Sequence, residues 1–222
     1  SEECKLYEIE VLFLLSFLQI NLAKNDKLKQ EYLDRIGERY QNNLLLNFVA
    51  ARLSHNLGLN DYCLNVLENR PSIKGKLPFY YLDYLQAMSY LYKLDYENAQ
   101  NKFEYFSANF KGVNYIKSAY HKLAWIAFLQ KNSEKKNEYF AKVISDGNTS
   151  IDEDKVAMKD AEGVYFSSPV LLKARLLYDG GYYEKALNQI IAYEQIDNIE
   201  YWYRLARIKS KLDYKNNEIT AH

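Results

Sequence analysis

Apolar residues recur at helical spacing along most of the chain, and in places they occupy two faces of the same predicted helix. Residues 79–94 are the clearest example. One face carries Tyr80, Ala87, Tyr90 and Leu94, and the other carries Tyr81, Tyr84, Met88, Leu91 and Tyr92. A helix on the surface of a domain has a single apolar stripe. Two apolar faces therefore predict a helix packed on both sides, as in a stack of helical hairpins.

Two stretches, LYKLDYENAQNKFEYF (91–106) and LLYDGGYYEKALNQI (176–190), share one pattern. A tyrosine, an alanine and a large apolar residue follow one another at spacings of three and four: Tyr96, Ala99 and Phe103 in the first stretch, Tyr183, Ala186 and Ile190 in the second. Such spacings place residues on one face of a helix. Another alanine, Ala87 or Ala174, lies nine positions before each tyrosine. Each stretch thus predicts a helix A, a short polar turn and a helix B, with alanines where the two helices cross.

This pattern resembles the tetratricopeptide repeat, whose period is about 34 residues. The small helix-A residues would be Ala51, Ala87, Ala124, Ala174 and Ala206, with spacings of 36, 37, 50 and 32. Cys63 and Lys136 stand where two B helices should have alanine, and the early tryptophan of the family is missing. The resemblance is to bacterial repeat proteins of uncharacterised activity. It implies an all-α fold, a right-handed α-solenoid of antiparallel helix-turn-helix repeats.

We predict a single helical-repeat domain over residues 1–222. It comprises an N-terminal hairpin (1–40), repeats at 41–70, 78–110, 113–146, 168–195 and 199–222, and an irregular insertion at 146–167 with a short helix at about 153–162. We expect the last complete helix to span about 199–212 and a fragment of a final B helix to follow Asp213. Solenoid ends need a polar cap, and the N-terminal hairpin is expected to serve as one.

Charge and composition exclude some classes of protein. Lysine plus arginine equals aspartate plus glutamate, at 29 each, which removes the electrostatic footprint of a general nucleic-acid binder. The apolar run from Val11 to Leu18 is too short to span a bilayer and predicts a buried helix. Its leading flank is acidic, unlike that of a signal peptide. The two cysteines, Cys4 and Cys63, form no disulfide framework. The compartment stays open: cytoplasm, or periplasm and envelope if a signal peptide was removed.

No motif points to catalysis, a cofactor or a metal. Asp146, Asn148, Ser150 and Asp152 alternate like early calcium ligands, but Ile151 and Ala157 stand where an EF-hand loop needs glycine and glutamate. A polar loop that begins a helix is the better interpretation. The histidines, His55, His121 and His222, are far apart, and no cysteine stands at ligand spacing from them. We expect no enzymatic activity and no cofactor.

The predicted partner-binding groove is a row of aromatic and basic residues. In the resembled family the concave face is lined by the A helices. Mapped onto this sequence, with neighbouring positions, that face comprises Arg52, His55, Tyr81, Tyr84, Met88, Tyr92, His121, Trp125, Arg175, Tyr178, Tyr203, Arg207 and Lys211. Tyrosine, tryptophan and arginine dominate binding hot spots. The alternative is that many of these rings simply pack between repeats.

We therefore predict a non-enzymatic scaffold that binds a peptide or protein segment on its concave face. The alternative function is a small-ligand or glycan-binding helical protein of a bacterial cell envelope, because stacked aromatic rings suit sugars as well as peptides. A third hypothesis is a structural segment that packs on further repeats or on a second copy through its C-terminal end.

Overall fold

The computed structural model describes residues 2–22, 25–71, 79–163, 168–193 and 198–220, which form helices and turns and contain no strand. The prediction of an all-α fold is therefore confirmed. Contacts group the chain into two compact units, Ser1–Ser89 (unit 1) and Tyr90–His222 (unit 2). The predicted repeat boundaries and the solenoid arrangement stay predictions.

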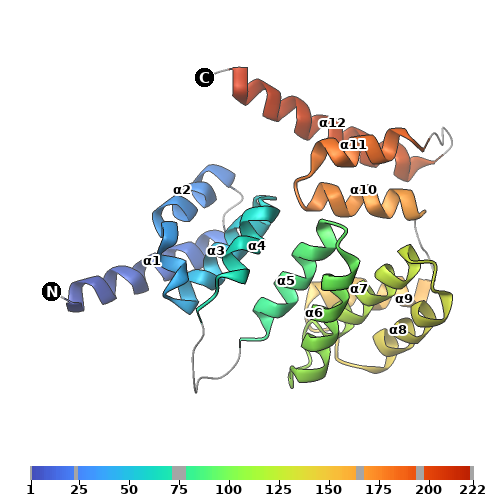
Figure 1. The fold of residues 1–222 in the computed structure, drawn as a ribbon, viewed down its shortest axis with the longest axis horizontal. Helices are drawn as coiled ribbons and strands as arrows, with labels where there is room; N and C mark the ends of the chain where they lie inside the picture. Colours follow the sequence, from blue (N-terminus) through green and yellow to red (C-terminus); the bar gives the residue numbers. More distant parts are fainter. Residues whose placement is uncertain (1, 23–24, 72–78, 164–167, 194–197, 221–222) are drawn as a thin grey trace. The chain divides into compact units, whose positions relative to one another are not determined.

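Unit 1 holds α1 (Glu2–Leu22), α2 (Asp26–Ile36), the 3-10 helix η1 (Gly37–Gln41), α3 (Leu44–Asn56), α4 (Asn60–Glu68) and most of α5 (Tyr81–Tyr92) (Figure 1). The side-chain oxygens of Asn25 and Asn43 accept hydrogen bonds from the first backbone N–H groups of α2 and α3. Such N-caps explain where both helices begin. α1 packs on α2 and α3, and α3 packs on α4. Their shared core includes Ile36, Leu46 and Val49.

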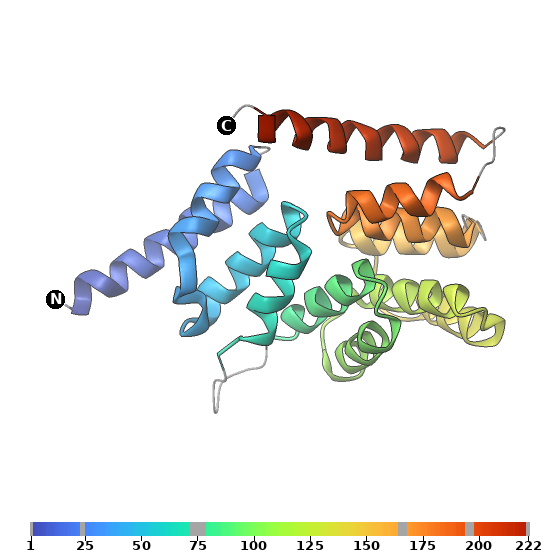
Figure 2. The same cartoon turned by 45° about the horizontal axis from the view of Figure 1, so that its top comes forward.

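Unit 2 continues with α6 (Tyr96–Asn109), α7 (Ile116–Leu129), α8 (Ser133–Ser145), α9 (Asp152–Gly163), α10 (Pro169–Asp179), α11 (Tyr183–Ile191) and α12 (Ile199–Thr220). Helices adjacent in sequence pack as neighbours from α6 to α9 and again from α10 to α12 (Figure 2). In addition, α9 packs on α7 and α12 packs on α10. The helix boundaries agree with the sequence pattern to within a few residues, except at the end of α11 and in α12.

The same backbone turn follows α3, α5, α7 and α10. The residue seven positions after the small helix-A residue has a left-handed backbone: Gly58 (φ 70°), Leu94 (63°), Lys131 (60°) and Gly181 (80°). The next N–H donates to the carbonyl five residues back, at 2.9 Å for Leu59–Ser54, 3.0 Å for Asp95–Tyr90, 2.8 Å for Asn132–Ala127 and 2.9 Å for Tyr182–Leu177. This closure ends helix A and reverses the chain. The predicted turns between helices A and B are confirmed.

Small side chains occupy the helix contacts of the hairpins. In the α3–α4 hairpin, Ala51 and Cys63 are wholly buried, and the Cys63 thiol lies 3.4 Å from the Ala51 carbonyl oxygen. In the α10–α11 hairpin, Ala174 and Ala186 are wholly buried in one apolar cluster with Ile190. These contacts leave little room for a larger side chain.

The prediction of a final hairpin after Asp213 is wrong. α12 runs without a break from Ile199 to Thr220, so position 213 is helical instead of beginning a turn. No glycine or proline interrupts this stretch. Ala206, expected at a helix crossing, is exposed. α12 instead buries Tyr201, Leu205 and Ile208 in the cluster with α10 and α11.

The outer face of α1 is apolar, unlike the polar cap expected of the N-terminal hairpin. α1 buries Leu12, Ser16 and Ile20 on one face, but its opposite face carries exposed leucines and valine instead of polar residues. The run Val11–Leu18 is thus buried on one face only.

The predicted insertion contributes α9, which packs on α7 and α8 and is hydrogen-bonded to the start of α7. Tyr115, before α7, has φ 64° and gives that helix no side-chain cap. The Asp154 carboxylate from α9 caps α7 instead, accepting hydrogen bonds from the N–H groups of Tyr115 (2.7 Å) and Ser118 (2.8 Å). Lys117 Nζ of α7 donates to the carbonyls of Val143 (2.6 Å) and Ile144 (3.1 Å) at the end of α8. Three helices are therefore joined through their ends.

Replacing Asp154 should destabilise this arrangement strongly. Asp154 is fully buried, and Asp154→Ala leaves the buried N–H of Ser118 and the part-buried N–H of Tyr115 without their acceptor. We expect the free energy of unfolding to fall by roughly 3 kcal/mol in urea titrations. Asp152→Ala, on the exposed first turn of the same helix, is the matched control and should change little. Equal effects of the two substitutions would show that Asp154 does not cap α7.

Candidate functional site

Three helices of unit 2 bring cationic and aromatic side chains together. We name this group the basic–aromatic cluster; it consists of Lys122 and Trp125 from α7, Arg175 and Tyr178 from α10, and Tyr203 and Arg207 from α12. Each helix supplies two residues at a spacing of three or four, which places both on one face. The packing of α12 on α10 brings the last four close together.

Trp125 is the centre of the first half of the cluster. Lys122 Nζ lies 3.5 Å from the centroid of a Trp125 ring, and Arg175 Cζ lies 5.0 Å away. An aromatic face attracts cations through its quadrupole. The ring of His121 packs edge-on at 4.7 Å. Trp125 is only 6% exposed, so its rings pack against these two cations and are largely closed to solvent.

Arg207 is the centre of the second half. Its guanidinium carbon lies 4.7 Å from the Tyr178 ring centroid and 5.6 Å from that of Tyr203. Its Nη1 donates to the Tyr203 hydroxyl at 3.3 Å. Arg207 is exposed, and among the described side chains it has no carboxylate within ion-pair distance. The two rings thus orient a guanidinium that still has donors available for a carboxylate.

Two carboxylates border the cluster. Asp179 Oδ2 lies 3.6 Å from Arg175 Nε, and Asp160 Oδ2 lies 3.3 Å from His121 Nε2. Burial raises the pKa of Asp179, and Arg175 opposes that shift. Burial also acts to raise the pKa of Asp160, but the hydrogen bond and charge of His121, with Lys122 and Arg175, lower it overall.

Two basic side chains of α7, His121 and Lys122, have pKa values below their usual range. Burial first, and then the positive charge of Arg175, lowers the pKa of Lys122 to about 7 from its usual 10.5. Burial, followed by the charge of Lys122, lowers the pKa of His121 to about 4. His121 is therefore neutral at pH 7, and its buried Nδ1 has no hydrogen-bond partner among the described residues. Lys122 exchanges its proton near neutral pH.

A smaller group forms in unit 1. Arg52 donates to the Tyr81 hydroxyl and lies with its Cζ 5.5 Å from that ring. Tyr81 stacks on Tyr84 at 6.0 Å and meets Phe48 edge-on at 6.0 Å. Burial, and then the charge of Arg52, lowers the pKa of His55 to about 4. Here the arginine lies against aromatic rings that belong to the core of the unit.

The structure divides the predicted groove residues by exposure. The buried ones are Tyr84, Met88, His121 and Trp125; the half-buried ones are Arg52, His55, Tyr81, Tyr92, Arg175 and Tyr178; the exposed ones are Tyr203, Arg207 and Lys211. The buried side chains position others instead of reaching a partner. Tyr92 also packs closely against Gly180, because a Cβ added at Gly180 would lie 2.8 Å from the Cβ of Tyr92. Of the thirteen, the structure joins Trp125, Arg175, Tyr178, Tyr203 and Arg207 in the cluster, and their binding role stays a prediction.

Lys122, Asp160 and Asp179 were not among the residues predicted from the sequence. Two of these had a signal: Lys122 lies three residues before Trp125, and Asp179 lies four residues after Arg175, so each shares a helix face with a predicted residue. Asp160 had none, since α9 stands outside the repeat pattern.

Within the described part of the chain, no three His, Cys, Asp or Glu side chains are grouped so that they could hold a metal ion. No described helix is both long and apolar enough to cross a membrane. Comparisons with protein-family models, with curated proteins and with solved structures gave no match. The resemblance to tetratricopeptide repeats therefore stays a prediction.

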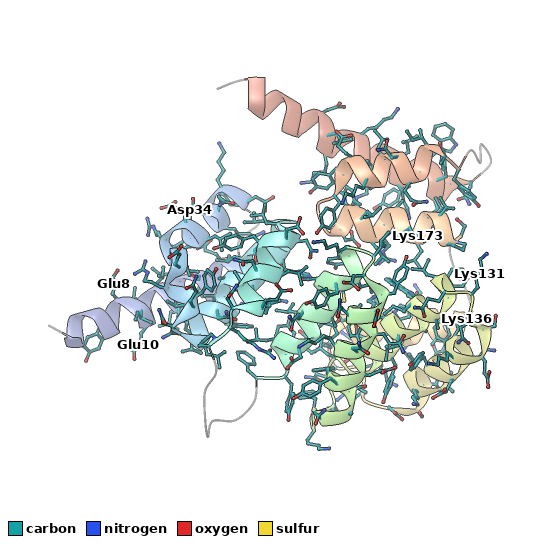
Figure 3. All side chains as sticks on the ribbon, in the orientation of Figure 1. Glu8, Glu10, Asp34, Lys131, Lys136 and Lys173 are labelled. Carbon is teal, nitrogen blue, oxygen red and sulfur yellow. The ribbon has the colours of Figure 1, made fainter. Side chains whose placement is uncertain are left out.

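Lys122 should react with amine-directed esters at lower pH than a surface lysine. A buried amine beside a second cation loses its proton early, so we expect half-maximal labelling near pH 7. Mass spectrometry of each lysine after brief labelling across about pH 6 to 9 measures this. Lys131, in the exposed turn after α7 (labelled in Figure 3), is the internal control. Labelling of Lys122 that rises no earlier than that of Lys131 would contradict the lowered pKa.

Proposed function

We propose that this protein is a non-enzymatic interaction module that binds an acidic peptide segment of a partner protein on the basic–aromatic cluster. The observation that carries the proposal is Arg207, an exposed guanidinium oriented by two tyrosine rings and without a carboxylate partner among the described residues. A preorganised arginine loses little side-chain entropy when it binds.

The chemistry of the cluster favours carboxylates over other groups. A guanidinium can donate two parallel hydrogen bonds to one carboxylate. Arg175, about one-third exposed, supplies a second cation on the neighbouring helix, and the exposed ring of Tyr203 offers an apolar contact beside Arg207. Alternate acidic and apolar side chains of an extended segment suit such a surface. A basic segment would meet like charges and is disfavoured.

We further propose that the helical hairpins form a right-handed solenoid of the tetratricopeptide type. The four equivalent left-handed turns and the buried small residues support this assignment. In such an arrangement α7 and α10 are A helices, so Trp125 and Arg175 occupy the equivalent position just after the small residue.

The glycan-binding alternative has less support. A sugar stacks on an accessible aromatic face, but Trp125 is almost wholly buried and two cations lie against its rings. Only Tyr203 in the cluster is an exposed ring.

The proposal predicts that acidic peptides are selected from a random library. Phage display of random 12-residue peptides against the whole chain should enrich sequences with Asp and Glu next to apolar residues. By fluorescence anisotropy, Arg207→Glu should weaken the binding of the best labelled peptide at least tenfold, since the substitution replaces attraction by repulsion. Lys209→Glu, two residues along α12, makes the same charge change outside the cluster and should have little effect.

A pH series gives a second measurement on the same peptide. Lys122 gains a proton as the pH falls through about 7, so affinity should rise between pH 8 and 6.5. Enrichment of neutral or basic peptides, or equal losses in Arg207→Glu and Lys209→Glu, would reject the cluster as the binding site.

A further inference from the structure

The outer face of α1 is an exposed apolar stripe. It consists of Tyr7, Val11, Leu14, Leu15, Leu18 and Leu22, whose exposure ranges from 36% at Leu15 to 76% at Leu22. At 3.6 residues per turn, the six fall within an arc of about 100°. Leu12, Ser16 and Ile20, which pack inside unit 1, lie on the opposite face. A surface helix normally presents polar residues outward, and a stripe of this kind marks an interaction surface.

The spacing of the stripe is the same when it is counted in either direction. From Tyr7 to Leu22 the intervals are four, three, one, three and four residues. The pattern therefore matches itself when the helix is reversed about a point between Leu14 and Leu15. Such spacing suits a two-fold interface, in which residue i of one copy contacts residue j of the other and residue j contacts residue i. We propose that a second copy of this chain covers the stripe, with the two α1 helices packed antiparallel about that point.

The register pairs Tyr7 with Leu22, Val11 with Leu18 and Leu14 with Leu15 of the second copy. Six pairs of large apolar side chains then meet in one continuous contact. A contact of one helix from each copy lies at the small end of stable interfaces, so we expect a dimer that dissociates in the micromolar range.

The charges beside the stripe favour the antiparallel arrangement. Glu8 and Glu10 lie on opposite sides of α1 (Figure 3), at the two edges of the stripe. In the antiparallel register they lie opposite Asn21 and Gln19 of the second copy, which are uncharged. A parallel pair in register would place Glu8 of one copy beside Glu10 of the other, and facing like charges are destabilising.

A hollow beside the stripe can receive a side chain of the second copy. It has a volume of about 420 Å³, an apolar floor of Tyr7, Val11, Leu12 and Leu15, and an edge that includes Arg35 and Arg39. The Leu22 side chain of the second copy, opposite Tyr7, is the most exposed member of the stripe and lies at this hollow in the proposed register. The proposal uses residues of unit 1 only and does not depend on the proposed function.

The oligomeric state of the whole chain tests the proposal. By sedimentation velocity, the apparent mass should rise from 26.2 kDa towards about twice that value as concentration increases through the micromolar range. Leu14→Glu/Leu18→Glu should abolish the rise, while circular dichroism confirms that the helices remain. The control, Ile144→Glu/Val156→Glu, changes two exposed apolar residues of unit 2 and should keep the dimer. A wild-type chain that stays monomeric, or a dimer that survives Leu14→Glu/Leu18→Glu, would overturn the proposal.

Cysteine cross-linking tests the direction of the helices. In a Cys4→Ser background, where the remaining Cys63 is wholly buried, Leu15→Cys should oxidise to a covalent dimer because both copies lie at the axis. Leu22→Cys should not, since the two sites are separated by about 22 Å along antiparallel helices. Cross-linking of Leu22→Cys as fast as that of Leu15→Cys would overturn the antiparallel arrangement.

Discussion

The hairpins α3–α4 and α10–α11 depend on close contact between helices at small, wholly buried side chains. Ala51 with Cys63, and Ala174 with Ala186, occupy the places where a larger residue would force the helices apart. This constraint fixes the surroundings of the next residue along helix A. Arg52 and Arg175 both follow the small residue directly, and each lies with its guanidinium over an aromatic ring. The small residue that lets the helices pack closely and the arginine that lies on an aromatic ring are thus neighbours in the sequence.

Much of the fold follows from the sequence because its determinants are local. Spacings of three and four residues predicted the helices, and the short polar segments between them predicted turns that the structure closes identically, even where Leu94 and Lys131 adopt the backbone that usually favours glycine. Long-range determinants were not predictable. Asp154 caps a helix 36 to 39 positions earlier, and no local pattern identifies that partner. Ala206 satisfied the repeat spacing, but the helix continues through Asp213 to Thr220, although Asp can form turns.

The sequence predicted the arginines and aromatic rings of the candidate site. It did not predict which side chains are accessible or that the pKa of Lys122 is lowered. The pattern identified Trp125, Arg175, Tyr178 and Arg207, because each lies close to a small helix-A residue. Which of them are accessible depends on tertiary packing: Trp125 is buried beneath cations, whereas Arg207 is open to solvent. The low pKa of Lys122 arises from burial and from Arg175, which comes from a helix about fifty positions later. No single segment of the sequence contains both causes.

The fold depends on small residues at the hairpin contacts, and α12 is one uninterrupted helix outside that pattern. Urea unfolding of Ala174→Leu and Ala206→Leu tests both statements, since the repeat spacing treats the two alanines alike and the structure does not. We predict that Ala174→Leu lowers the free energy of unfolding by about 1–3 kcal/mol through overpacking. Ala206→Leu, at an exposed position, should change it by less than about 0.5 kcal/mol. Equal losses at both positions, or no loss at Ala174, would contradict the account.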